Sequence, residues 1–195
     1  MTSLDALLSR ASVTDLVEPA PDGPALEQIL QAGLRAPDHG RLRPWRFVLI
    51  RGAARQRWAQ MIVSALQARE PDAPEATVQK QRRRALETPL IIALGARLRP
   101  GHKIPELEQM LSVGAAAMNM LNAAHALGYG AVWLTGGNAY DPRVVEALGL
   151  APTDKLAGFL FVGTPGSAPL AARRPALADH VVEWDGEASA EHVRE

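Results

Sequence analysis

Apolar residues recur along the chain at two different spacings, which divide it into predicted helices and strands. Six segments show the three-to-four-residue spacing of a helix with one buried face. These predicted helices cover residues 4–10, 24–34, 54–69, 75–86, 105–127 and 142–148. Short and densely apolar runs predict strands at residues 45–51, 90–94, 129–134 and 156–162, with a further strand-like piece at 181–184.

This mixture of helices and strands indicates an α+β or α/β sheet domain. The chain has 195 residues, which is enough for one domain and short for two. We therefore expect a single domain over residues 1–195. A Pro- and Ala-rich tail, about residues 166–195, follows the last long strand.

The predicted helix at residues 105–127 is apolar around most of its circumference. Such a helix has to be covered on most sides, and one domain of this size can hardly cover it alone. The tail is also too long and too apolar for a linker. Both features favour self-association, with this helix at a subunit interface and the tail wrapped around the partner subunit.

Composition and charge argue against several classes of function. Twenty-one basic residues balance twenty-one acidic ones, so no long-range attraction draws the chain to nucleic acid or to an anionic membrane. The absence of cysteine excludes disulfides, thiolate catalysis and sulfur-bound metals. The five histidines do not stand at metal-ligand spacing. We expect a cytoplasmic protein with no metal, no nucleic-acid partner and no membrane span.

The residues Arg35-Ala36-Pro37-Asp38-His39 form a short polar loop between a predicted helix and a predicted strand. Loops that rigid elements hold on both sides frequently carry binding and catalytic groups. This loop offers a cation, Arg35, and a titratable imidazole, His39. A second pair, Arg10 and Ser12, combines a forked cation with a hydroxyl and would suit an oxyanion.

Stronger signatures are missing from the sequence, which has no Gly-rich dinucleotide fingerprint, phosphate loop or nucleophile elbow. The basic cluster of Lys80, Arg82, Arg83 and Arg84 could be a nucleic-acid or heparin patch. Zero net charge favours the other interpretation, the solvated face of a charged helix. His125 lies inside the apolar helix, where a core or interface histidine is more typical than a ligand.

Several further motifs stand in a characteristic order along nearly the whole chain. They are Leu7-Leu8-Ser9-Arg10-Ala11-Ser12, Glu18-Pro19-Ala20-Pro21, residues 29–39, Pro44-Trp45, His102-Lys103-Ile104-Pro105 with Glu108-Gln109, Gly128-Tyr129-Gly130-Ala131-Val132-Trp133, and residues 158–165. In order and spacing these motifs resemble the nitroreductase family of FMN-dependent oxidoreductases, especially its short NAD(P)H nitroreductases.

The resemblance implies an α+β nitroreductase-like fold, with a central mixed sheet flanked by helices. It also implies an intertwined homodimer with two FMN sites at the subunit interface. The residues that it assigns to FMN are Arg10, Ala11, Ser12, Arg35, His39, Val132, Trp133, Leu134 and either Arg173 or Arg174. Those that it assigns to the nicotinamide nucleotide are Leu121, Asn122, Ala123, Ala124, His125 and Ala126.

The activity that the resemblance implies is reduction of nitroaromatics, quinones or similar flat acceptors by NAD(P)H, in a ping-pong mechanism. The chemistry would take place on N5 of the flavin, so no side chain is assigned as a catalytic group. Two alternatives keep the same fold. One is an FMN-binding or storage protein without turnover, and the other is different flavin chemistry, such as dehalogenation or flavin fragmentation.

The chain departs from the pattern of the family at Ala11, Asp15 and Leu134, and also at Leu107, which stands where an aromatic residue is expected. Ala11 and Asp15 stand where basic residues are common, and Leu134 stands where close relatives carry an arginine. The first two departures should weaken the phosphate site, and the third removes a polar contact near the flavin or the acceptor.

Overall fold

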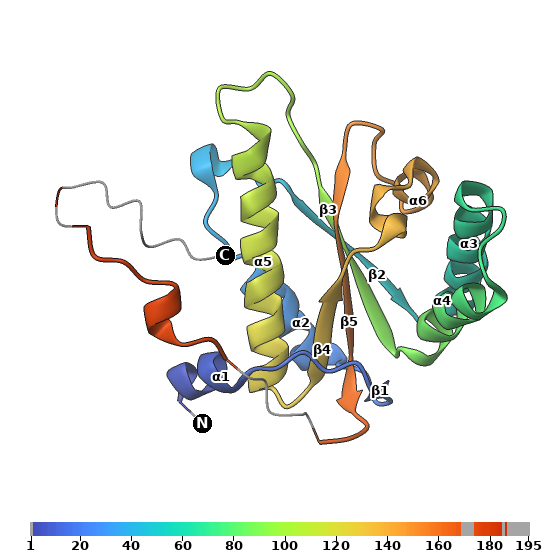
Figure 1. The fold of residues 1–195 in the computed structure, drawn as a ribbon, viewed down its shortest axis with the longest axis horizontal. Coiled ribbons are helices and arrows are strands. Elements are labelled where there is room, and N and C mark those ends of the chain that lie inside the picture. The colour runs from blue at the N-terminus through green and yellow to red at the C-terminus, as the bar shows by residue number, and fades with distance from the viewer. Residues whose placement is uncertain (1, 169–173, 185, 187–195) are drawn as a thin grey trace.

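A five-stranded antiparallel sheet forms the centre of the structure (Figure 1). The computed structural model describes residues 2–168, 174–184 and 186. The strands are β1 (Leu16–Val17), β2 (Trp45–Arg51), β3 (Leu90–Ala96), β4 (Gly130–Leu134) and β5 (Lys155–Pro165). Their order is β1-β5-β3-β2, and β4 also pairs with β5. All four pairings are antiparallel, where a mixed sheet was expected. Most strand connections contain helices, so the sequence pattern did not fix the strand directions.

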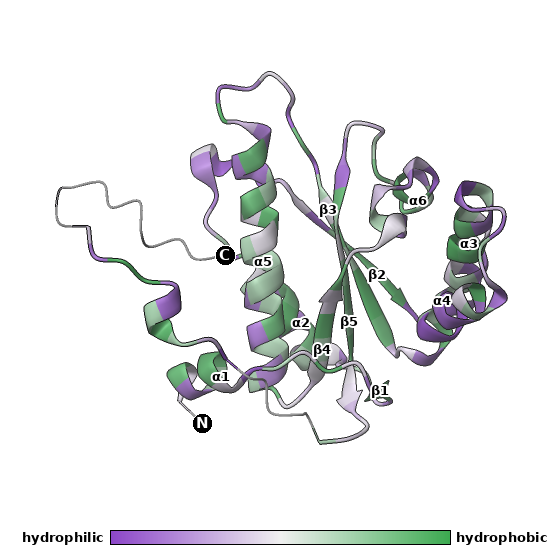
Figure 2. Ribbon diagram, viewed as in Figure 1, coloured by the Kyte–Doolittle hydropathy of each residue, from purple (hydrophilic) through white to green (hydrophobic). Residues whose placement is uncertain are grey.

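Helices cover both faces of this sheet (Figure 1). The elements are α1 (Ser3–Ser9), α2 (Gly23–Gly33), α3 (Ala54–Arg69), α4 (Glu75–Glu87), α5 (Glu106–Ala126) and α6 (Pro142–Ala147). On one face, α2 and α5 pack against the sheet, and on the other face α3 and α6 do so. The largely hydrophilic α4 packs beside α3 (Figure 2).

The central strand β3 explains why two cores form. All of its residues are buried, and successive side chains of a strand point to opposite faces. Leu90, Ile92 and Leu94 therefore enter the core under α2 and α5, while Ile91 and Ala93 enter the core under α3 and α6. Such a strand appears in the sequence as a continuous apolar run, because both of its faces are covered.

The structure confirms the six predicted helices and the four longer strands. The strand-like piece at residues 181–184 was a wrong prediction, because this segment forms no strand and pairs with no other described segment. A run of β-branched residues becomes a strand only when a neighbouring strand accepts its backbone hydrogen bonds. The two-residue strand β1 was too short to give a pattern.

Part of the apolar surface of α5 is left uncovered within one chain. Leu107 and Leu111 are 69% and 63% exposed, and Met118 and Leu127 are also exposed. Further exposed apolar side chains lie on α1 and on the described part of the tail: Leu4, Leu7, Leu8, Leu177, Val181, Val182 and Trp184. Exposed apolar surface on this scale indicates an interaction site. It agrees with the interface expected for this helix.

Candidate functional site

The loop at residues 35–39 lies along α5. Ser112 Oγ on α5 donates a 2.7 Å hydrogen bond to the carbonyl of Pro37. One end of α2 is held in the same way, because Asn119 Nδ2 donates a 3.2 Å hydrogen bond to the carbonyl of Ala32. These two contacts fix the loop to the longest helix of the fold.

Asp38 shapes the remainder of this loop. Its carboxylate oxygens accept hydrogen bonds from the backbone N–H groups of Leu42 at 3.1 Å and Arg43 at 2.8 Å. Arg41 and Arg43 have left-handed backbone angles, with φ of 56° and 50°. Such angles cost free energy in residues other than glycine and are concentrated at functional sites. Asp38 therefore holds a strained turn directly after His39, a role that the sequence pattern did not reveal.

His39 is paired with the first turn of α5. Its Nδ1 lies 2.7 Å from Glu108 Oε2, and both side chains are partly exposed. A carboxylate in the first turn of a helix interacts favourably with the helix dipole, so α5 supports the partner of His39. The second predicted flavin contact of the loop, Arg35, is exposed. Glu108 belongs to a sequence motif that does not by itself indicate this pairing.

The predicted phosphate site begins where α1 ends. Arg10 Nε and Nη1 are buried, and neither has a hydrogen-bond partner among the described residues. Buried polar groups are nearly always hydrogen-bonded, because an unpaired one costs free energy. Two unpaired, buried donors of a guanidinium therefore suit an oxyanion, which accepts charge-assisted hydrogen bonds in a forked geometry. Ser12 is exposed nearby in the chain and Ala11 is half-buried.

A second arginine reaches this segment from the tail. Arg174 Nη2 donates a hydrogen bond to the backbone carbonyl of Arg10. Of the two residues predicted for a second phosphate contact, Arg174 is therefore placed beside the first arginine. Arg173 lies outside the described residues.

The strand β4 lies next to the segment that follows Arg10. The N–H of Val13 donates a 3.0 Å hydrogen bond to the carbonyl of Ala131, and Val13 packs against Val132. This pairing brings two sets of predicted flavin contacts to one region, Arg10, Ala11 and Ser12 with Val132, Trp133 and Leu134.

The end of β4 is fixed by contacts with β5. Trp133 Nε1 donates a 2.9 Å hydrogen bond to the carbonyl of Ala157. The next residue of β5, Gly158, has a φ of 125°, and a Cβ atom there would lie 2.6 Å from the carbonyl oxygen of Leu134. Only glycine combines this backbone angle with so close an approach. The position of Leu134 thus depends on a glycine opposite it.

The predicted flavin contacts form two separate groups within one chain. Ser9 Oγ lies 2.9 Å from His125 Nε2, which places the Arg10 group at the C-terminal end of α5. His39 is paired with Glu108 at the opposite end. The 17 residues from Glu108 to His125 span about 25 Å at the rise of an α-helix. A single chain does not bring His39 to Arg10.

The predicted nicotinamide contacts occupy the last turns of α5. Leu121 and Ala124 are buried in the hydrophobic core, so their side chains face away from any ligand at the surface. His125 contacts Ser9 of the same chain, as a histidine with a structural role would. Asn122 Oδ1 is buried and has no hydrogen-bond partner within the part of the chain that the structure describes. Ala123 is half-buried and Ala126 is exposed, and the assignment of this stretch stays a prediction.

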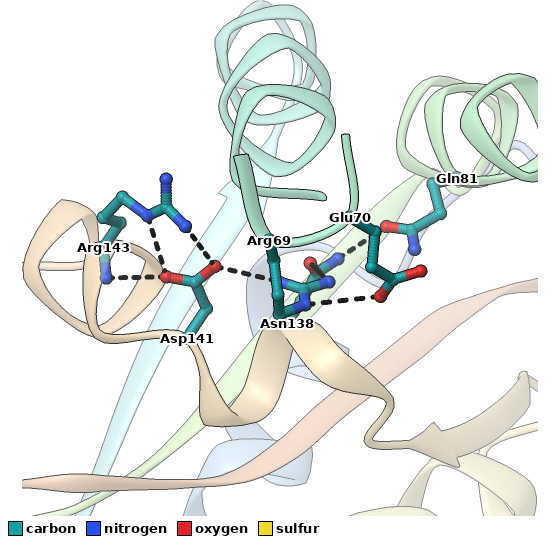
Figure 3. Close-up of polar contacts among 6 residues, drawn as sticks. All are labelled: Arg69, Glu70, Gln81, Asn138, Asp141 and Arg143. Atoms are coloured by element: carbon teal, nitrogen blue, oxygen red, sulfur yellow. Dashed lines mark hydrogen bonds and ion pairs between the residues drawn. The ribbon is translucent and has the colours of Figure 1, made fainter. Parts of the chain in front are cut away.

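A polar network joins α3, α4 and α6 on the other side of the sheet (Figure 3). Asp141, whose side chain is 2% exposed, accepts hydrogen bonds from Arg69 Nη1 at 2.8 Å and from Arg143 Nε at 3.2 Å. Asn138 Nδ2 donates a 2.7 Å hydrogen bond to Gln81 Oε1 on α4. Burial alone would raise the pKa of Asp141. The hydrogen bonds from the backbone and side chain of Arg143 and from Arg69 outweigh burial and lower this pKa below its usual range.

No helix in the described part of the chain is both long and apolar enough to cross a membrane. Within residues 2–168, 174–184 and 186, no three His, Cys, Asp or Glu side chains are placed to hold a metal ion.

The fold is that of the nitroreductase-like α+β proteins. A crystal structure of a nitroreductase-like family protein from Bacillus cereus superposes with a TM-score of 0.84 and 24% identity, covering 95% of this chain and 97% of that chain. An inferred nitroreductase from Desulfovibrio desulfuricans, solved in complex with FMN, has a TM-score of 0.74 and 26% identity, covering 94% and 97%.

The family itself follows from sequence comparison. The model of the nitroreductase family matches residues 7–164. YdjA of Escherichia coli K12, named as an inferred NAD(P)H nitroreductase, is 41% identical over 165 residues, or 85% of this chain and 89% of that protein. The chain belongs to the nitroreductase family, and the resemblance noted in its motifs is confirmed.

Proposed function

We propose that this protein is an FMN-dependent oxidoreductase that uses NAD(P)H to reduce nitroaromatics, quinones or similar flat acceptors. Family membership supports the reaction class, the name of the Escherichia coli relative supports the reductant, and the Desulfovibrio relative in complex with FMN supports the cofactor. The observation that carries the proposal for this chain is the half-buried Arg10, which has two buried guanidinium donors that no group in the described part of the chain satisfies.

Arg10 would hold the phosphate of FMN with those two donors. Ser12 would add a hydroxyl and Ala11 its backbone N–H. Arg174, already hydrogen-bonded to the carbonyl of Arg10, would add a second positive charge and so offset the absence of basic residues at Ala11 and Asp15. The isoalloxazine ring of FMN would extend from the phosphate site toward β4. There the backbone groups of Val132, Trp133 and Leu134 would line the ring.

The complete site would require two copies of the chain. Arg10 and His39 lie near opposite ends of α5, and α5 exposes apolar residues such as Leu107 and Leu111. A two-fold axis that packs α5 antiparallel to its copy would bring His39 and Arg35 of the partner subunit to Arg10. A closed two-fold dimer is the commonest form of protein oligomer, and this arrangement creates two equal sites.

Bound FMN would supply the hydride and electron transfer, while the residues of this chain bind, orient and shield it. Arg35 and the imidazole of His39 would place donors against the flavin, and Glu108 would hold His39 in position. NAD(P)H and the acceptor would enter the same opening in turn, as a ping-pong reaction requires. A nitro acceptor would take two electrons from NAD(P)H and two protons, leaving a nitroso group and water.

The visible absorption spectrum of the purified protein tests this function. The oxidised protein should show flavin bands that bleach when NADPH or NADH is added without oxygen and that return when a nitroaromatic is added. Flavin bands that neither nicotinamide bleaches would favour a storage protein. A colourless protein that also fails to take up added FMN would contradict the proposal.

A further inference from the structure

A cavity of about 410 Å³ lies at the end of the sheet where β2 begins and β3 ends. Three arginines line it, Arg46 on β2 and Arg97 and Arg99 in the segment that joins β3 to α5. This volume lies within the range of small-molecule sites, about 300–1,000 Å³. No residue of the lining is among those assigned to FMN or to the nicotinamide nucleotide, so the sequence motifs leave the cavity without a role.

The pairing of β2 with β3 places two of these arginines on one face of the sheet. Arg46 pairs with Gly95, and residues that pair directly across antiparallel strands point to the same face. The N–H of Arg97 donates a 2.7 Å hydrogen bond to the carbonyl of Pro44, which continues the pairing beyond the end of β3. Because side chains alternate along a strand, Arg97 shares the face of Gly95 and Arg46. The sheet itself therefore brings both arginines to one cavity.

The positive charge of this cavity has no free carboxylate beside it. Asp154 is the one acidic group that the described residues contribute to the lining, and it is buried and accepts a 3.0 Å hydrogen bond from the N–H of Ala151. None of the three arginines forms an ion pair within the described segments. Arg46 Nη1 donates to the carbonyls of Arg43 at 3.0 Å and Trp45 at 2.8 Å, which fixes its guanidinium. An anion that enters the cavity would therefore meet a net positive charge.

A buried glutamine of α5 holds Arg99 in place. Gln109 Oε1 accepts a 2.9 Å hydrogen bond from the N–H of Arg99. Its Nε2 donates to the carbonyl of Arg99 at 3.3 Å and to the carbonyl of Ile104 at 3.0 Å. The backbone of Arg99 is therefore fixed through both of its polar groups before any ligand binds, which lowers the cost of binding.

The segment that carries Arg97 and Arg99 packs against the loop of His39. A Cβ atom at Gly40 would overlap the side chain of Ile104, so the two segments are in close contact. Leu42 lines the cavity and lies three residues after His39, and three residues span at most about 11 Å. The proposed function places His39 at the flavin of the partner subunit. The cavity would then be within reach of an extended dinucleotide whose nicotinamide is stacked on that flavin.

We propose that this cavity binds the 2′-phosphate of NADPH and thereby selects NADPH over NADH. A phosphate monoester carries about −1.5 to −2 charges at neutral pH, and planar guanidinium groups bind phosphate oxygens in a forked geometry. NADH has a hydroxyl group in place of this phosphate and would leave the three arginines without an anion. The inference rests on the proposed function, and it assigns the choice of reductant to the subunit that contributes His39.

Binding of two unreactive nucleotides tests the site without turnover. Adenosine 2′,5′-bisphosphate carries the 2′-phosphate, and 5′-AMP lacks it. In calorimetric titrations of the wild-type holoprotein, the bisphosphate should bind at least tenfold more tightly than 5′-AMP. The variant Arg97→Gln/Arg99→Gln should lose at least tenfold in affinity for the bisphosphate and none for 5′-AMP, because each charge-assisted contact contributes to binding.

A second double variant provides the matched control. Arg57 and Arg82 are exposed and lie outside the cavity lining. Arg57→Gln/Arg82→Gln removes the same amount of charge from the protein and should bind both nucleotides as the wild type does.

Anaerobic stopped-flow reduction of the bound flavin gives the second readout. The wild type should reach half-maximal rate at a lower concentration of NADPH than of NADH. The variant Arg97→Gln/Arg99→Gln should lose about tenfold or more of this preference through the Kd for NADPH. Its rate at saturating NADPH and its response to NADH should stay unchanged, because the arginines do not touch the reacting ring.

Three outcomes would decide against parts of this account. Affinity for the bisphosphate that Arg97→Gln/Arg99→Gln leaves unchanged would overturn the inference. Inorganic phosphate that binds as tightly as the bisphosphate in a parallel titration, and is lost in the same variant, would assign the cavity to free phosphate instead. A flavin that neither nicotinamide reduces, in a protein whose bisphosphate binding depends on the two arginines, would confirm the phosphate site and contradict the proposed function.

Discussion

Glu108 and His125 stand 17 residues apart on α5, and each contacts one of the two groups of predicted flavin residues. Glu108 lies 2.7 Å from His39, and His125 lies 2.9 Å from Ser9, the neighbour of Arg10. The helix therefore acts as a rigid spacer that keeps the groups about 25 Å apart. No small motion within one chain can close this distance, and under the proposed function a second copy of the chain would supply the missing half.

Replacement of Arg10 by alanine should lower the affinity for FMN at least tenfold. Loss of a charge-assisted hydrogen bond costs about 1.5–3 kcal/mol, and about 1.4 kcal/mol corresponds to a factor of ten. Fluorescence titration of the apoprotein with FMN measures the change. Arg82→Ala removes an exposed cation elsewhere and should leave the affinity as it is, whereas equal affinities of Arg10→Ala and wild type would place the phosphate at another site.

Replacement of Leu111 by glutamate should dissociate the expected dimer. Leu111 is 63% exposed in one chain, so the substitution spares the core of the subunit. Two copies would each lose about 1.5 kcal/mol or more of apolar burial and would place charges inside the interface. Sedimentation velocity should show a monomer, and flavin absorbance should show that this monomer has lost its FMN. Leu86→Glu, on the distant α4, is the control, and a dimeric Leu111→Glu protein would exclude this face of α5 as the interface.

Replacement of Asp141 by asparagine should lower the free energy of unfolding at neutral pH by about 2 kcal/mol, because hydrogen bonds to charged groups contribute about 1.5–3 kcal/mol. The pKa of this buried carboxyl is lowered in the folded state from its ordinary value of 3.8. Its contribution is therefore complete above that value and is lost as the pH falls through the lower pKa of the folded state.

Urea unfolding of both proteins between pH 7 and pH 2.5 measures this effect. The difference between wild type and Asp141→Asn should be constant down to about pH 4 and should shrink below it, as the linkage of protonation to folding requires. A difference that stays constant down to pH 2.5 would mean that the charge of Asp141 does not stabilise the fold.

Much of the fold could be predicted from the sequence because its elements are strongly patterned. The run of apolar residues in β3 and the three-to-four-residue apolar spacing in α3 are local signals, and they predicted both elements nearly to the residue. Strand direction and the unpaired segment at residues 181–184 could not be predicted. Both depend on which other strand is available as a partner, and a local pattern carries no such information.

The sequence resemblance named candidate site residues, and the structure shows how these residues are separated within one chain. The motifs named Arg10 and His39 together, yet only the contacts of α5 show that they lie at opposite ends of one helix. Asp38 and Asp141 were missed as organising groups for a similar reason. Each acts through hydrogen bonds to distant or backbone partners, which leave no periodic trace in the sequence.

Complementation between two defective subunits tests the shared site most directly. Co-expression of Arg10→Ala chains with Arg35→Ala/His39→Ala chains, each with a different affinity tag, allows the mixed dimer to be purified. If each site takes Arg10 from one copy and His39 from the other, the mixed dimer contains one intact site and one with every substitution. Flavin absorbance should then give about one FMN per dimer, with little in either parent. A mixed dimer as empty as its parents would show that each site lies within a single chain, and would contradict the account.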